Sequence, residues 1–271
     1  MSYIGNSNRD FLIDVKLGLI PGYSLVHKFG RNAAVPTVPT PIAINGVYRT
    51  PTASPANGLD IVSTSNEDNL DIDGDGAHEV TVQGLVITNG LFVAAEEVIE
   101  MEGTVPAVLT TEFVRVYRAW VSKCGLYANT GVQSAIGTIT IAEVTSGDEW
   151  LVIDTYMTNG SAGQSQTALY TTPSNTTSLL LGLYWTIEAA KTVKMYFFHR
   201  PNADDVTGPY TGARRLVEQF DDALGTYPMD MKAPITKFTG ATDMGFMAEV
   251  SQGTCSISAD FQLLVIDNDY L

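Results

Sequence analysis

The chain has 271 residues, of which 45% are hydrophobic and 17% charged, a balance typical of a folded protein with a substantial core. Its formal net charge of −15 disfavours direct nucleic-acid binding, because a surface that holds phosphates relies on lysine and arginine. The same charge suits an outward-facing surface or docking onto a basic partner.

Cysteine use and hydropathy indicate an origin in the cytoplasm. Two cysteines, Cys124 and Cys255, are too few for a disulfide framework, so buried free thiols are favoured, with one long-range bridge left open. The start of the chain lacks the basic and apolar regions of a signal peptide. No apolar stretch reaches the roughly 20 residues that span a bilayer, so we expect no membrane contact.

The first 58 residues are predicted to form an N-terminal arm. Residues 8–19 have a helical pattern, in which Asn8 is a candidate cap and apolar residues recur every four positions. A short strand follows at 24–32. Five prolines within 33–58 disfavour a central strand, yet the segment is too apolar for a flexible tether. We therefore expect an extended arm that lies on another surface. In an oligomer, this surface could belong to a neighbouring subunit.

Regular strand signals begin at Leu59. Residues 59–65 and 78–85 have the alternation of strands and are joined by an acidic loop. Residues 90–102 contain good helix formers, but the close spacing of turns on both sides favours a strand. Strands at 113–121 and 136–141 follow.

The strand at 113–121 has large apolar groups on both faces. This pattern predicts a central strand that is covered on both sides. Arg115 and Arg118 interrupt it, and each must find a partner or reach water.

A turn at 145–148 is the predicted seam between two lobes. Further strands are expected at 149–157, within 166–187, at 191–200 and at 255–267, whereas residues 214–224 fit a helix by local pattern. In the closing strand one face is predicted to hold Cys255, Ile257, Ala259, Phe261, Leu263 and Val265. The predicted fold is all-β, with two antiparallel, jelly-roll-like β-sandwich lobes at 59–145 and 146–271 after the arm at 1–58.

The acidic loop carries the sharpest motif, Asp71-Ile-Asp73-Gly-Asp75-Gly, which matches the start of a calcium-binding loop. The twelfth position is Val82, so the bidentate glutamate is missing, and no helices flank the loop. An exposed Asp-Gly turn is therefore favoured over a calcium site.

No catalytic constellation stands out. The histidines His27, His78 and His199 lack the spacing of zinc ligands. A carboxylate cluster is expected on a solvent face and not across a glycosidic bond, and it comprises Glu96, Glu97, Glu100 and Glu102. We therefore predict no catalytic, cofactor-binding or metal-binding residues, no cofactor and no enzymatic activity.

Aromatic and basic residues also favour structural roles. Trp120, Trp150 and Trp185 all lie in predicted strands, so core positions are favoured over a sugar-binding platform. Arg214 and Arg215, even with the two strand arginines, are too few for a nucleic-acid patch and fit interface anchors better.

Several segments occur in an order that resembles a known group. They are VHKFGRN, EVTVQGL, FVRVYRAWV with GTITI, YTTPSNTTSLLL and SADFQLLVIDN. Through these segments the chain resembles an uncharacterised family of virion structural proteins from tailed bacteriophages of marine and freshwater bacteria. The resemblance implies a β-sandwich subunit of the particle, located in the virion.

The first functional hypothesis is a capsid cement or decoration protein that stabilises the shell through subunit contacts. Its expected partners are further copies of itself, with a trimer favoured by the threefold positions of a capsid lattice, and the major capsid protein or other virion proteins. The alternatives are a tail, collar or fibre component, or a carbohydrate- or receptor-binding β-module.

Overall fold

Nearly all of the chain is β structure, as the computed structural model of residues 10–46, 58–72, 74–125, 134–155, 163–188, 191–203, 213–230, 234 and 236–271 shows. Within these ranges all paired strands are antiparallel. The predicted all-β antiparallel fold is confirmed. The described part of the chain contains no helix with the length and apolar character needed to cross a membrane.

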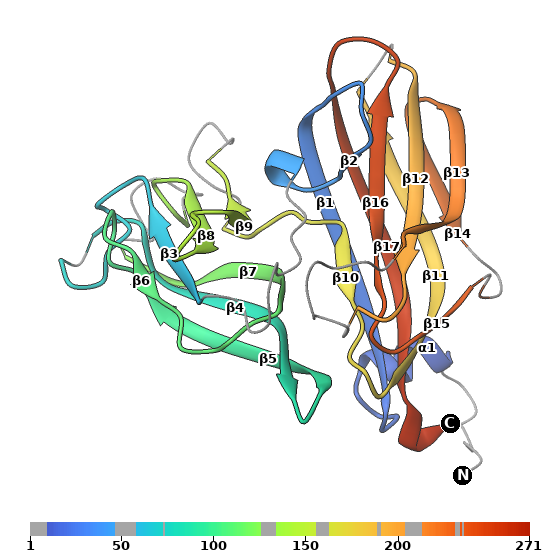
Figure 1. Cartoon of the computed structure of the whole chain (residues 1–271), viewed down its shortest axis with the longest axis horizontal. Coiled ribbons are helices and arrows are strands. Elements are labelled where there is room, and N and C mark those ends of the chain that lie inside the picture. Colours follow the sequence, from blue (N-terminus) through green and yellow to red (C-terminus); the bar gives the residue numbers. More distant parts are fainter. Residues whose placement is uncertain are drawn as a thin grey trace.

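The larger lobe consists of two five-stranded sheets (Figure 1). The first has the order β1-β17-β11-β14, with β15 also paired to β11. Its strands are β1 (Tyr23–Val35), β17 (Cys255–Asp267), β11 (Thr176–Ile187), β14 (Thr226–Asp230) and β15 (Lys237–Thr239). The second has the order β10-β16-β12-β13, with β2 also paired to β16. Its strands are β10 (Leu169–Thr171), β16 (Asp243–Val250), β12 (Val193–Arg200), β13 (Arg215–Ala223) and β2 (Thr40–Pro41).

The strand order of the larger lobe is that of a jelly roll. Along the chain, β1 lies in the first sheet, β2 and β10 in the second, β11 in the first, and β12 and β13 in the second. The chain then crosses to β14, back to β16, and ends in β17 beside β1. Apart from the neighbours β12 and β13, the paired strands are distant in sequence, as in the double Greek key of jelly rolls.

The smaller lobe is inserted between β2 and β10. It has a four-stranded sheet of order β6-β3-β8-β9 and a three-stranded sheet of order β5-β4-β7. The strands of the four-stranded sheet are β6 (Ala107–Val108), β3 (Leu59–Ser63), β8 (Ile139–Glu143) and β9 (Glu149–Ile153). Those of the three-stranded sheet are β5 (Leu91–Glu100), β4 (Ala77–Thr88) and β7 (Arg115–Cys124). Figure 1 shows this lobe beside the jelly roll.

The two connections to the smaller lobe lie next to each other. The backbone N–H of Ala168 donates to the carbonyl of Ile42 at 2.9 Å, and Ile42 in turn donates to Phe246 of β16 at 3.0 Å. Gly30 of β1 faces this crossing, where a Cβ would lie 2.2 Å from both Ile42 O and Ala168 N. Only glycine therefore lets β1 pass under the point where the chain leaves and returns.

Each lobe has its own core. In the jelly roll both sheets contribute to one cluster, at whose centre Phe197, Phe246 and Phe261 contact one another edge-on or tilted. The predicted inward face of β17 is confirmed, because all six of its named side chains belong to this cluster. A second cluster lies within the smaller lobe and draws residues from both of its sheets.

The strands do not follow the domain boundaries predicted from the sequence. The segment assigned to an arm contains β1, which pairs with β17 over most of its length, and β2, which pairs with β16. The five prolines of residues 33–58 begin only after β1, and β2 is limited to two residues. Strand β9 pairs with β8, so the turn at 145–148 is a hairpin within the smaller lobe and not a seam. Residues 1–9 and 47–57 of the arm lie outside the described residues.

Three local predictions change. The helix at 214–224 is wrong: this segment is β13, and two register shifts against β12 disturb the simple alternation of its side chains. Strand β7 is not central, because it pairs within its sheet with β4 alone. The short N-terminal helix is confirmed as α1 (Phe11–Lys16), but its cap is Asp10, whose carboxylate accepts from Leu12 N at 2.8 Å.

Candidate functional site

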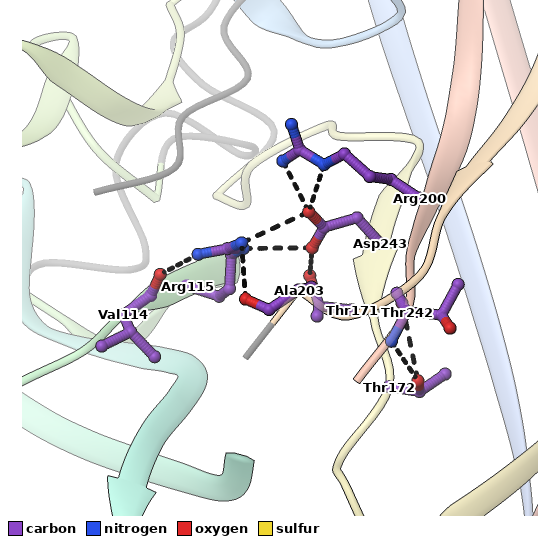
Figure 2. A network of polar contacts seen from close by, with 8 residues as sticks. All are labelled: Val114, Arg115, Thr171, Thr172, Arg200, Ala203, Thr242 and Asp243. Carbon is purple, nitrogen blue, oxygen red and sulfur yellow. Dashed lines mark hydrogen bonds and ion pairs between the residues drawn. The ribbon is translucent and has the colours of Figure 1, made fainter. Parts of the chain in front are cut away.

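The most deeply buried ionic contact joins the two lobes (Figure 2). Asp243, at the start of β16 in the jelly roll, is fully buried. Arg115, at the start of β7 in the smaller lobe, donates to it through Nε at 3.0 Å and Nη2 at 3.3 Å. Arg200, at the end of β12, donates through Nη2 at 2.7 Å and Nε at 3.2 Å. One carboxylate thus holds two guanidinium groups from different lobes.

The carboxylate of Asp243 is saturated by its neighbours. The hydroxyl of Thr171 donates to Oδ1 at 2.6 Å, in addition to the arginine contacts. Arg115 uses its remaining donors on the carbonyls of Val114 at 2.7 Å and Ala203 at 3.3 Å. Because its donors and acceptors are occupied in this way, the network is suited to holding the two lobes together and not to a reaction.

Burial alone would raise the pKa of Asp243, but the charges of Arg115 and Arg200 and the hydrogen bonds to the carboxylate lower it overall. A carboxyl whose folded pKa is depressed adds stability above its unfolded pKa of about 3.9. That contribution is lost as the pH falls through the lower folded value. The network is therefore fully formed at neutral pH.

Backbone hydrogen bonds reinforce the junction on both sides of this network. Phe92 N donates to Ser174 Oγ at 2.8 Å, and Ser174 N donates to Phe92 O at 3.0 Å. Along β7, Ala119 N donates to Ser165 Oγ at 3.0 Å, while Ser165 N donates to Ala119 O at 2.8 Å. The free edge of β7 is thus covered by the segment that returns to the jelly roll.

A pocket of about 380 Å³ lies beside this junction. Lys28 of β1 lines it, and its Nζ donates to the carbonyl of Tyr117 in β7 at 2.5 Å. The same Nζ lies 4.7 Å from the centre of the Tyr117 ring. Burial, with the nearby charge of Arg118, lowers the pKa of Lys28 to about 7. Burial raises the pKa of Tyr117 to about 12, so its phenol stays neutral.

The acidic loop is organised by a residue that the sequence analysis did not single out. Asp68 is fully buried and accepts from Ala77 N at 2.7 Å, Ile136 N at 2.8 Å, Gly137 N at 2.8 Å and Ser63 Oγ at 2.5 Å. These donors come from three segments, of which only the one with Ile136 and Gly137 is far from Asp68 in sequence. Nothing in the local pattern could have revealed the contacts with Ile136 and Gly137.

The aspartates of the calcium-like motif do not form a ligand set in the described structure. Asp71 and Asp75 are exposed, and Asp73 lies outside the described residues. Within the described chain, no three His, Cys, Asp or Glu side chains group closely enough to hold a metal ion. The described part of the loop is held by Asp68.

The three histidines lie apart. His78 is buried, with Nε2 2.7 Å from the carbonyl of Gly74. His27 is half-exposed and lies 3.4 Å from Asp260. Burial and the charge of a neighbouring arginine lower the pKa of His199.

The glutamate cluster faces solvent for the most part. Glu97 is half-buried and accepts from Thr110 N and Thr111 N, both at 2.8 Å, while Glu96 accepts from Gln83 at 2.6 Å. Burial alone would raise the pKa of Glu97, but these hydrogen bonds lower it overall. Within the cluster, Glu97 thus holds the backbone at Thr110 and Thr111 beside β5.

The remaining candidates have structural positions. Trp150 and Trp185 are buried in the two cores, and Trp120 is half-buried beneath Arg118. Cys124 is half-buried and Cys255 buried, and both are free thiols, so the alternative of a bridge between them is wrong.

No protein-family model and no curated protein matches the chain. Among solved structures, T=1 particles derived from infectious bursal virus match at 13% identity over 92% of this chain and 70% of that chain, with a TM-score of 0.25. The VP2 subviral particle of infectious bursal disease virus matches at 15% identity over 91% and 72%, with a TM-score of 0.24. Scores of this size do not indicate a shared fold.

Replacing Asp243 by Asn should destabilise the protein strongly. The amide keeps the shape but leaves Arg115 and Arg200 buried without a counter-charge, so we expect a loss of about 3–5 kcal/mol in the free energy of unfolding. Urea denaturation measures it. Asp260→Asn, which removes the same charge from the exposed pair with His27, is the control and should have little effect. Equal effects of the two substitutions would contradict the interpretation that the Asp243 network holds the two lobes together.

Asp68→Ala tests what holds the acidic loop. Its four donors would lose their acceptor, so we expect a loss of about 2–4 kcal/mol in the free energy of unfolding. Asp75→Ala, in the same loop but exposed, should be neutral in the same denaturation experiment. The opposite order of effects, together with a melting temperature raised by calcium, would restore the calcium-site interpretation.

Proposed function

We propose that this protein is a non-enzymatic structural subunit of a bacteriophage virion, and specifically a capsid cement or decoration protein. It would act through contacts between subunits, in a homo-oligomer and on the major capsid protein. Support comes from the ordered segments that resemble a phage virion family. A jelly-roll lobe is also an architecture that capsid subunits use widely, although the same architecture serves lectins.

The observation that carries this proposal is an apolar end of the jelly roll. Six large apolar side chains gather there, each between 38% and 69% exposed. They are Leu12, Ile13, Leu17, Leu19, Tyr270 and Leu271. Helix α1 and the C-terminus lie at the same end of the lobe in Figure 1. We call this set the apolar end.

Helix α1 is apolar on more than the face that the fold uses. Val15 is buried against β-strand residues of the jelly roll, and Phe11 contacts Tyr23 edge-on with ring centres 5.7 Å apart. A helix that served only this packing would carry polar residues on its outer side. Here Ile13 and Leu17 point outward instead. Exposed apolar patches of this kind mark contact surfaces, and we assign this one to a second copy of the chain.

The double variant Ile13→Glu, Leu17→Glu should weaken self-association without unfolding the subunit. Two carboxylates buried in an apolar contact lose their hydration, so the oligomer seen by light scattering should shift to monomer. Leu224→Glu, at an equally exposed apolar site on the jelly roll, is the control and should leave the mass unchanged. A monomeric wild-type protein that also fails to bind assembled phage particles would contradict the proposal.

A carbohydrate- or receptor-binding role is the second candidate, and one observation favours it. Tyr227 is half-exposed and stacks on Trp185 with ring centres 4.9 Å apart, over a pocket of about 260 Å³. His27 and Asp260 line the same pocket. An aromatic face beside a carboxylate suits a sugar ring with its hydroxyl groups.

Glycan-array binding tests this second role. If the pocket binds sugars, Tyr227→Ala should abolish the signal, because the exposed ring is the stacking surface. The control Tyr270→Ala, at an exposed tyrosine outside the pocket, should retain it. Binding that survives Tyr227→Ala, or no binding by the wild-type protein, would remove this candidate.

A further inference from the structure

The pocket at the lobe junction concentrates positive charge in an acidic protein. The chain carries 30 acidic side chains against 15 lysines and arginines and 3 histidines. Four basic side chains nevertheless line this one pocket, and no acidic side chain does. The four are Lys16, His27, Lys28 and Arg118. Such a reversal of charge indicates a negative ligand.

Lys28 is the centre of this reversal. Its side chain is buried, at 6% exposure, and an ammonium group has three N–H donors. In the described structure its polar partner is the carbonyl of Tyr117, with the Tyr117 and Tyr170 rings 4.7 and 6.0 Å from Nζ. No carboxylate of the described residues forms an ion pair with it. Buried charges normally have such a partner, so Lys28 lacks one that a ligand can supply.

Both lobes build the pocket. Lys28 and His27 belong to β1 of the jelly roll, whereas Tyr117 and Arg118 belong to β7 of the inserted lobe. Ser165, on the segment that returns to the jelly roll, adds a hydroxyl to the lining. A ligand held here would contact both lobes.

We propose that this pocket binds a small oxyanion of phosphate or carboxylate type, held by Lys28 and Arg118 between the two lobes. The anion would give the ammonium its missing acceptors and counter-charge. Hydrogen bonds between charged groups are among the strongest in proteins, and a guanidinium presents paired donors to such an anion. The proposal does not rest on the virion role or on the apolar end.

The charges around Lys28 determine how binding depends on pH. The other ionisable groups around it are Arg118 and Lys16, His27, which is paired with Asp260, and Glu96, whose charge contributes to the raised pKa of Tyr117. Tyr117 and Tyr170 are neutral, because burial raises the pKa of both phenols. Burial lowers the pKa of Lys28 to about 7, so the empty pocket holds a largely neutral amine at pH 8. An anion binds the ammonium form, and binding at pH 8 therefore takes up a proton.

Isothermal titration calorimetry of the full chain tests the proposal, with inorganic phosphate and citrate as separate probes. We expect tighter binding at pH 6.5 than at pH 8, and a heat at pH 8 that varies with the ionisation enthalpy of the buffer, as proton uptake requires. Lys28→Met should weaken binding by about tenfold or more and remove most of the uptake. Lys194→Met, the same substitution at an exposed site on β12, should change neither.

Arg118→Gln keeps the test decisive if Lys28→Met fails to fold. Because Arg118 is exposed, its replacement should weaken binding without unfolding the chain. Binding of phosphate alone or citrate alone would support the proposal and show which type of oxyanion the pocket prefers. Binding of both would support a pocket that accepts phosphate and carboxylate groups alike. No binding of either probe at millimolar concentration would overturn the proposal. So would equal weakening by Lys28→Met and Lys194→Met, which would indicate general charge screening.

Discussion

The buried carboxylate of Asp243 is the constraint on which the arrangement of the two lobes depends. A jelly roll interrupted between β2 and β10 has two adjacent chain crossings and an inserted lobe that would otherwise pivot on them. Asp243 links Arg115 of that lobe to Arg200 of the jelly roll in a buried contact. Removing a charge from water is costly, so the two buried guanidinium groups depend on this one carboxylate for their counter-charge. The geometry of the junction follows from that requirement.

Once the lobes are fixed in this way, Tyr117 closes the open side of the jelly roll over Lys28. The carbonyl and ring of Tyr117 replace the water that a lysine on β1 would otherwise reach. The result is a basic pocket whose walls belong to two different sheets. The pocket is thus a consequence of the insertion, since neither lobe alone would bury Lys28 against β7.

Sequence reasoning succeeded where the signal is local. The alternation of Cys255 to Val265 depends only on neighbouring residues, and the inner face of β17 was predicted correctly. It failed where pairing is distant. Arg115 meets a partner 128 positions away and Asp68 binds backbone groups 68 and 69 positions away, so no window of sequence contains both members. The same distance hid the pairing of β1 with β17, and made an integral jelly-roll strand look like part of an arm.

Helix α1 connects the two surfaces that carry the functional proposals. Its outward residue Ile13 and its C-cap residue Leu17 belong to the apolar end, whereas its last residue, Lys16, lines the basic pocket. The helix has only six residues and rests on the jelly roll through Val15 and Phe11. A neighbour docked on its outer side would therefore also fix the position of Lys16. Contact between subunits would then constrain one of the four basic side chains that line the pocket.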